Sequence, residues 1–180
     1  KRKTQYQNII TPVAESQLFQ TSTYIVPTPG GNAAYGSYGI LFTPKQNILL
    51  KYITFNNSLI VKKANYNIRQ VDLFDTKTQQ QLKIMTFDVM SGTDILNVDY
   101  SLIGGKQYMI SVNTMRDDIV QYLNGYTIST NEYVTVNSFA QNATTNVWQY
   151  PTVTIEPAAP LGINLVFEYN VEERTSFTST

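Results

Sequence analysis

The chain contains no histidine and no cysteine, and these two absences remove many kinds of active site. They exclude a Ser-His-Asp triad, a thiol nucleophile, a zinc site built from histidine or cysteine, an iron–sulfur cluster and a histidine-ligated haem. An acid–base mechanism would have to use carboxylate, tyrosine or lysine side chains. This reduces the number of possible hydrolytic mechanisms but does not exclude hydrolysis. We therefore expect a protein that is not an enzyme.

Charge is also scarce, since only 14% of the 180 residues are charged, against about a quarter in an average protein. Thirteen basic residues balance thirteen acidic ones, so the formal net charge is zero. Nucleic-acid-binding proteins and polybasic membrane-surface proteins normally carry a basic excess. We expect no nucleic-acid partner. No run of about 18 apolar residues is present, so we also expect no transmembrane segment.

The polar surface must instead come from uncharged residues, and the chain is rich in Asn, Gln, Thr and Ser, with 13 tyrosines. Thr and Tyr favour strands, whereas Asn and Ser favour turns. This composition is typical of a β-rich extracellular protein. We expect a secreted or cell-surface location, with a virion exterior as the alternative.

The start of the sequence bears on the same question. It opens on Lys1 rather than methionine, and no apolar stretch follows the basic residues, so we expect no signal peptide within it. A removed signal peptide or lipoprotein leader, which would leave a lipid-anchored protein, and a cloning boundary both fit this observation.

Short segments with two-residue alternation recur along most of the chain, with polar turns between them. Residues 68–75 and 82–89 flank one such turn and predict an antiparallel hairpin. Short strands at regular spacing predict an all-β fold, an antiparallel β-sandwich that resembles a jelly roll. Further strands are expected at residues 24–26, 40–43, 48–56, 94–100, 108–112, 133–138 and 161–169.

One segment has helical spacing instead. Ile119, Tyr122 and Leu123 are spaced for a helix and Gly125 follows as a stop, so we expect at most one short helix near residues 115–124.

The ends of the chain differ from its middle. We divide the chain into an N-terminal arm of residues 1–20, a single β-sandwich domain of residues 21–170 and a C-terminal tail of residues 171–180. Extended ends can add to an open sheet edge of a neighbour, so self-association through both ends is a second hypothesis about partners. Disordered ends are the simpler alternative.

Aromatic residues in predicted loops are the main functional signal. Two lie in or at the end of the glycine- and proline-rich stretch 27–39, one follows an Asn-Gly turn, and two precede a proline. Aromatic ring faces stack on the C–H face of a sugar, while amide side chains bond its hydroxyl groups. The alternative is that the single tryptophan packs in the core. The predicted ligand-binding residues are Tyr35, Tyr38, Tyr126, Trp148 and Tyr150.

Carboxylates give weaker signals. A pair of them could serve a glycosidase, but the alternation places Asp72 and Asp88 on polar faces or at strand ends, away from any obvious aromatic cleft. We expect no cofactor. A structural calcium ion is the one metal considered, and no candidate follows EF-hand spacing. Its possible ligands are Asp94 with Asp99, Asp117 with Asp118, and Glu172 with Glu173.

Several strand-end and turn residues share one pattern: Gly39–Pro44, Leu50, Ile53–Phe55, Ile68, Val71–Asp75, Leu82, Thr86–Phe87, Gly105–Val112, Val147–Pro151 and Asn164–Phe167. In this pattern residues 38–168 resemble a bacterial β-sandwich family catalogued as domain of unknown function four-zero-eight-two. The longer segment 115–131 and the N-terminal arm depart from that pattern. The resemblance implies a sandwich displayed outside a bacterial cell, with a glycan-binding or adhesive role, and it carries no catalytic residues.

These observations together predict a non-catalytic extracellular or cell-surface module that binds a glycan or another surface ligand, or mediates adhesion. The alternative is a structural subunit of an extracellular or virion assembly that is held together by its terminal arms.

Overall fold

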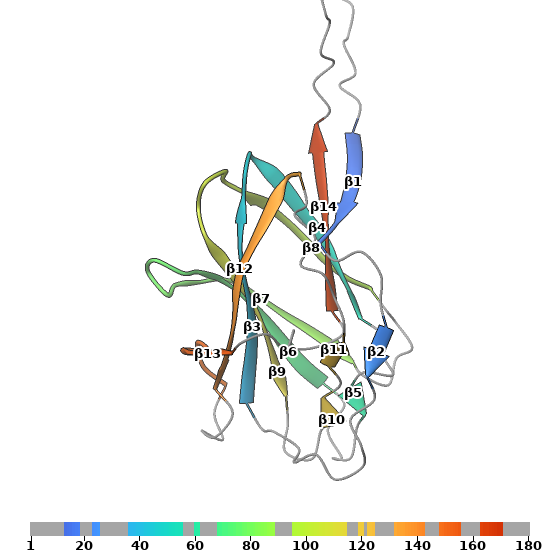
Figure 1. Cartoon of the computed structure of the whole chain (residues 1–180), viewed down its shortest axis with the longest axis vertical. Coiled ribbons are helices and arrows are strands. Elements are labelled where there is room, and N and C mark those ends of the chain that lie inside the picture. Colours follow the sequence, from blue (N-terminus) through green and yellow to red (C-terminus); the bar gives the residue numbers. More distant parts are fainter. Residues whose placement is uncertain are drawn as a thin grey trace, which may run out of the picture.

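A computed structural model shows an all-β protein built from two large antiparallel sheets that pack together as a β-sandwich (Figure 1). The predicted fold class is therefore confirmed. The structure describes residues 13–18, 23–25, 36–55, 60–61, 68–88, 95–114, 119–120, 122–124, 132–142, 148–155 and 163–170.

The smaller of the two large sheets has four strands in the order β1-β14-β4-β8. In Figure 1, β1 and β14 run side by side at one edge of this sheet. Every neighbouring pair is antiparallel. The strands are β1 (Val13–Gln17), β14 (Ile163–Asn170), β4 (Ile48–Phe55) and β8 (Ile95–Leu102).

The larger sheet has six strands in the order β13-β12-β3-β9-β6-β7. Within it β6 and β7 form the predicted hairpin, with Val71 opposite Met85. The strands are β13 (Val153–Ile155), β12 (Val134–Asn142), β3 (Gly36–Pro44), β9 (Tyr108–Thr114), β6 (Ile68–Asp75) and β7 (Gln81–Asp88).

The helix expected near residues 115–124 is wrong where the structure describes that segment. Residues 119–120 form β10 (Ile119–Val120), which pairs with β5 (Ile60–Val61). Residues 122–124 form β11 (Tyr122–Asn124), which pairs with β2 (Thr23–Ile25). Three apolar positions cannot separate the two periodicities, and β-branched and aromatic residues favour strands once a partner strand is present. Residues 115–118 and 121 lie outside the described residues.

The core lies between the two sheets, and aromatic rings connect them. The ring of Phe42 on β3 lies 6.1 Å from that of Tyr108 on β9 and 5.8 Å from that of Phe167 on β14, measured between centroids. Alternate residues of each strand point into this core, which is why strands with an apolar set on one face are found here. The buried side chains include Ile40, Leu50, Ile53, Val71, Leu73, Val98, Ile110, Val112, Val134 and Leu165.

Strand β1 comes from the expected N-terminal arm and pairs along its whole length with β14 of the same chain. Leu18, the residue that follows it, is completely buried in the core, and its N–H donates a hydrogen bond to the carbonyl of Leu165 at 2.9 Å. The described part of the arm is therefore an edge strand of the sandwich.

Two turns that connect the sheets contact each other at one end of the sandwich. The turn between β3 and β4 supplies Asn47, whose Oδ1 accepts the N–H of Gly104 at 2.9 Å. The N–H of Gly105 donates to the carbonyl of Pro44 at 2.7 Å. A Cβ atom on Gly104 would lie 2.7 Å from the Cα of Gln46, so only glycine permits this close approach.

Replacing Gly104 by alanine should destabilise the protein more than the same change at Gly105. The added methyl at Gly104 forces two backbones apart, which costs about 3 kcal/mol. Gly105 has a positive φ of 78° but no atom near its Cβ position, so Gly105→Ala costs only about 1 kcal/mol. Denaturant unfolding of both variants measures the difference, and equal losses would contradict the close approach of the two turns.

The turn after β6 is organised by the carboxylate of Asp75. Its Oδ1 accepts the N–H groups of Lys77 at 2.9 Å and Thr78 at 3.2 Å, and its Oδ2 lies 2.7 Å from Nζ of Lys106. The hydrogen bond from Lys106 is the main reason that the pKa of Asp75 is lowered, and the two backbone N–H groups act in the same direction.

Asp75→Asn should remove a stabilisation that depends on pH. A carboxylate with a lowered pKa stabilises the fold above its usual pKa of 3.8, and this stability is lost as the pH falls through the folded-state pKa. The difference in melting temperature between wild type and Asp75→Asn should therefore narrow as the pH falls from about 5 to about 2. Lys106→Met removes the partner of Asp75, so the difference in melting temperature between wild type and this variant should narrow in the same way. A difference that is constant with pH would contradict this assignment.

Candidate functional site

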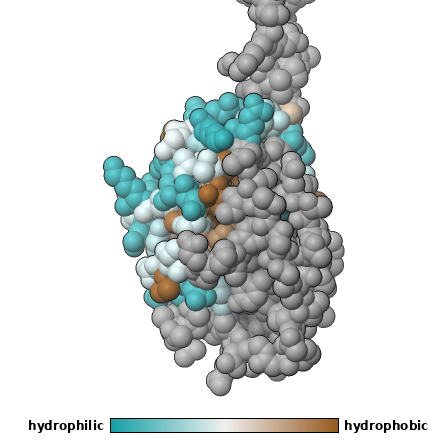
Figure 2. All heavy atoms as spheres, in the orientation of Figure 1, coloured by the Kyte–Doolittle hydropathy of each residue, from teal (hydrophilic) through white to brown (hydrophobic). Residues whose placement is uncertain are grey.

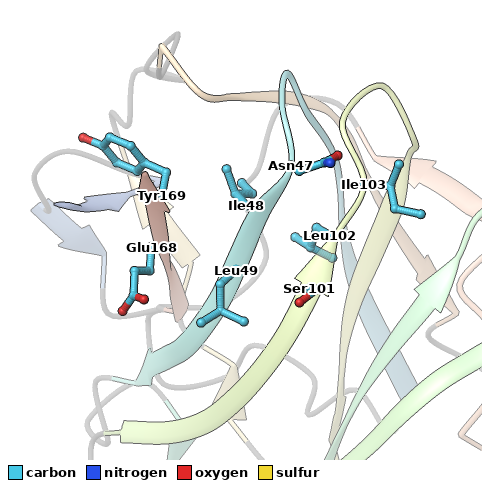
Figure 3. Close-up of a pocket in the computed structure, with 8 residues that line it drawn as sticks. All are labelled: Asn47, Ile48, Leu49, Ser101, Leu102, Ile103, Glu168 and Tyr169. Carbon is cyan, nitrogen blue, oxygen red and sulfur yellow. The ribbon is translucent and has the colours of Figure 1, made fainter. Parts of the chain in front are cut away.

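A pocket of about 380 Å³ lies at one end of the four-stranded sheet (Figure 3). Its volume falls within the range of about 300–1,000 Å³ that is usual for small-molecule sites. Strands β4, β8 and β14 and the turns that follow or precede them supply its lining. The lining residues are Asn47, Ile48, Leu49, Ser101, Leu102, Ile103, Glu168 and Tyr169.

Antiparallel register places three of the lining residues in one row across the sheet. Glu168 is opposite Leu49, and Leu49 is opposite Ser101, so the row runs from β14 through β4 to β8. Figure 3 shows these side chains extending from three neighbouring strands. The row continues on β1, where Glu15 is opposite Glu168. A carboxylate, an apolar side chain and a hydroxyl group therefore lie next to one another.

Two carboxylates that face each other across strands repel, and here a lysine lies between them. Nζ of Lys51 lies 3.1 Å from Oε1 of Glu15 and also bonds Oε2 of Glu168. The hydroxyl of Tyr52 donates to Oε2 of Glu15 at 3.1 Å. The hydrogen bond to Glu168, followed by that to Glu15, raises the pKa of Lys51, so the ammonium group stays protonated at neutral pH.

A β-bulge explains how two consecutive residues reach the same carboxylate. Tyr52 is opposite Val166 and Leu50 is opposite Phe167, so the register leaves no residue of β14 directly opposite Lys51. An extra residue in one strand disrupts the alternation locally and turns its side chain toward a new direction. Lys51 and Tyr52 both contact Glu15 for this reason.

The end of the pocket is held by contacts between the sheets. The ring of Tyr169 stacks on that of Tyr133, which precedes β12, with centroids 3.7 Å apart and an interplanar angle of 25°. The N–H of Ile103 donates to the hydroxyl of Tyr108 at 3.0 Å. These contacts fix the ends of β14 and β8, so the pocket is formed by a well-packed part of the fold.

None of the predicted ligand-binding aromatic residues that the structure describes lines this pocket. Tyr38 is wrongly placed by the sequence prediction, because it lies within β3 and its side chain is 1% exposed in the core. Tyr35 and Tyr126 lie outside the described residues. Trp148 and Tyr150 are half-buried and lie close together in the segment before β13.

The segment with Trp148 and Tyr150 packs on the outer face of the six-stranded sheet. The ring of Tyr150 meets Phe74 edge-on with centroids 5.2 Å apart, and burial raises the pKa of Tyr150. The backbone N–H of Gln149 donates to Oγ of Ser37 at 3.1 Å. Tyr150 thus has a packing role in addition to any role in binding.

A buried network of polar side chains lies beneath this segment. Ser37 donates to Oδ1 of Asn113 at 2.6 Å, and Asn113 donates to Oδ2 of Asp72 at 2.7 Å. Nε2 of Gln70 and Nε2 of Gln81 each donate to Oδ1 of Asp72 at 2.8 Å. The carboxylate of Asp72 is 4% exposed, so neutral amide groups take the place of water around it.

Sequence reasoning missed the pocket residues. Glu168 is visible among the carboxylates, and the alternation of its strand places it opposite the core face. Glu15, Lys51 and Ser101 belong to other strands, and only the register of β1, β14, β4 and β8 brings them to Glu168. No local sequence pattern around these residues indicates that they lie close to Glu168.

Metal and membrane features can be assessed only for the described part of the chain. That part contains no cluster of three or more acidic, histidine or cysteine side chains able to hold a metal ion. Asp99 is exposed on β8, and the other suggested calcium ligands lie outside the described residues. Among these same residues no helix has the length and apolar character needed to cross a bilayer.

Comparison with models of known protein families and with curated proteins finds no match for this chain. The resemblance to the β-sandwich family named above therefore stays a prediction.

Asp72→Ala should destabilise the protein by about 2 kcal/mol or more, because it leaves the amide donors of Asn113, Gln70 and Gln81 without their acceptor. Ser111 is a matched control, since it is opposite Asp72 on β9 and its buried Oγ has no hydrogen-bond partner. Ser111→Ala should change the free energy of unfolding by less than about 0.5 kcal/mol, or increase it slightly. Equal losses in denaturant unfolding would contradict this description of the network.

Proposed function

We propose that this protein is a non-catalytic binding module of the cell surface or the extracellular medium, and that it recognises a glycan in the pocket between β4, β8 and β14. The observation that carries the proposal is the pocket itself, which combines a few polar groups with an apolar wall. Concave sites of this kind are the usual place for small ligands.

The lining suits a sugar because each part of a sugar finds a counterpart. The carboxylate of Glu168 accepts hydrogen bonds from hydroxyl groups, and the Ser101 hydroxyl both donates and accepts them. The apolar side chains of Leu49 and Ile103 face the C–H groups of the ring, and Ile103 is 59% exposed. A ligand with hydroxyl groups on one side and C–H groups on the other satisfies both kinds of wall.

The composition supports a location at the cell surface or in the extracellular medium. The described surface in Figure 2 is mostly hydrophilic, with apolar residues in several separate spots. Only 14% of the residues are charged, so uncharged polar groups provide much of this surface. Adhesion to a glycan-bearing surface is consistent with such a module.

Trp148 and Tyr150 supply a second candidate contact for a glycan. Both are half-buried on the other sheet, beside the exposed side chain of Gln149. A longer glycan that follows the surface would contact the aromatic and amide groups there. Their alanine variants belong in the same binding assay.

The alternative function, a structural subunit joined to its neighbours by terminal arms, is favoured less. The described part of the N-terminal arm pairs with β14 of its own chain, and Leu18 is buried in its own core. An arm used in this way serves the fold of one subunit.

Ser101→Trp should abolish glycan binding, because the indole ring fills the pocket from an exposed strand position. We expect at least a tenfold loss of affinity on a glycan array and in calorimetric titration with each glycan bound by the wild type. The unfolding free energy should change by less than about 0.5 kcal/mol, as is usual for surface positions.

Asn97→Trp is the matched control. Asn97 is exposed on the same strand but does not line the pocket, so this variant should bind like the wild type. The proposed site is wrong if Ser101→Trp retains full affinity for a bound glycan. The proposed function is wrong if the wild type binds no glycan.

A further inference from the structure

The charge in the lining of the pocket is negative. Of the eight described residues that line it, Glu168 is the only one with a charged side chain. Its carboxylate is a quarter exposed, so it is accessible from the pocket while it bonds Lys51. A ligand in the pocket therefore contacts a negatively charged group.

In the described part of the chain, the ion-pair partners of Glu168 do not cancel the charge of the cluster that they form with it. Two carboxylates, those of Glu15 and Glu168, share the single ammonium of Lys51, which leaves one negative charge on the cluster. Glu15 is 44% exposed and its second oxygen bonds the uncharged hydroxyl of Tyr52. The surplus negative charge thus lies beside the row of Glu168, Leu49 and Ser101.

We propose that the pocket selects an amino sugar, with its protonated amine beside Glu168 and its hydroxyl groups toward Ser101 and Asn47. This inference rests on the proposed function and names the class of ligand within it. The surplus charge attracts a cationic ligand, tolerates a neutral one and repels an acidic sugar. The apolar wall of Leu49 and Ile103 contacts the ring of any of the three.

Glu15 acts as a positioning residue in this arrangement. It does not line the pocket, but it takes part of the Lys51 ammonium away from Glu168. Without the Glu15 carboxylate, Lys51 and Glu168 form a neutral pair and the preference for an amine disappears. The N-terminal strand β1 thereby contributes to specificity from outside the pocket.

Three monosaccharides with the same ring but different charge test the inference: glucosamine, glucose and glucuronate. The full chain is titrated with each at pH 6 and low salt, and dissociation constants are read from NMR shifts of the Ser101 and Ile103 amides. An exposed charge pair is worth a modest amount, so glucosamine should bind about threefold more tightly than glucose. Glucuronate should bind more weakly than glucose by a similar factor.

Two variants identify the origin of the preference. Glu168→Gln removes the negative wall, and Glu15→Gln removes only the surplus charge, so in both the ratio of glucosamine to glucose affinity should fall to about one. Asp99→Asn is the control, because Asp99 is an exposed carboxylate on β8 that does not line the pocket. This variant should keep the wild-type ratio of glucosamine to glucose affinity. Added salt should reduce the ratio in the wild type, because it screens exposed charges.

The outcomes separate this inference from the proposed function. Equal binding of all three sugars, or tighter binding of glucuronate, overturns the amine preference and leaves glycan recognition standing. A wild-type preference that persists in Glu168→Gln overturns the role of the pocket carboxylate. If Nα-acetyllysine amide binds as tightly as glucosamine, recognition of a sugar is overturned. If no sugar binds, both proposals fail.

Discussion

The aromatic contact between Phe42, Tyr108 and Phe167 joins the two sheets, and the arrangement of the pocket depends on it. Phe42 and Tyr108 come from the six-stranded sheet and Phe167 from the four-stranded one. The same Tyr108 accepts the N–H of Ile103 through its hydroxyl, and Phe167 immediately precedes Glu168. Packing in the core thus determines where two walls of the pocket lie.

Charged residues are scarce in this chain, yet three of them form a cluster on the four-stranded sheet. The chain has 26 charged residues, thirteen of each sign, and three of them meet where β1, β14 and β4 adjoin. An exposed ion pair contributes little to stability, so stability alone is a weak reason for this arrangement. The bulge that brings Lys51 to the two glutamates is a feature often found beside binding sites.

The carboxylates on the two sheets differ in their exposure and in their partners. On the four-stranded sheet the carboxylates remain partly exposed and share a lysine, so they stay able to meet a ligand. On the six-stranded sheet Asp72 is buried and surrounded by neutral amides, and this network supports the segment that carries Trp148 and Tyr150. The first arrangement suits recognition, whereas the second suits a rigid support for a loop.

The sequence by itself determined the class of fold and most of its strands, because two-residue alternation and turn residues are local properties. The β6–β7 hairpin is a clear case, since both strands and their turn are adjacent in the chain. The local pattern gave a wrong prediction at residues 119–120 and 122–124, where pairing with β5 and β2 decides between helix and strand. Only the tertiary structure decided the site: it buried Tyr38 and brought Glu15, Lys51 and Glu168 together over more than 150 positions. Register between distant strands depends on long-range packing, which no local pattern encodes.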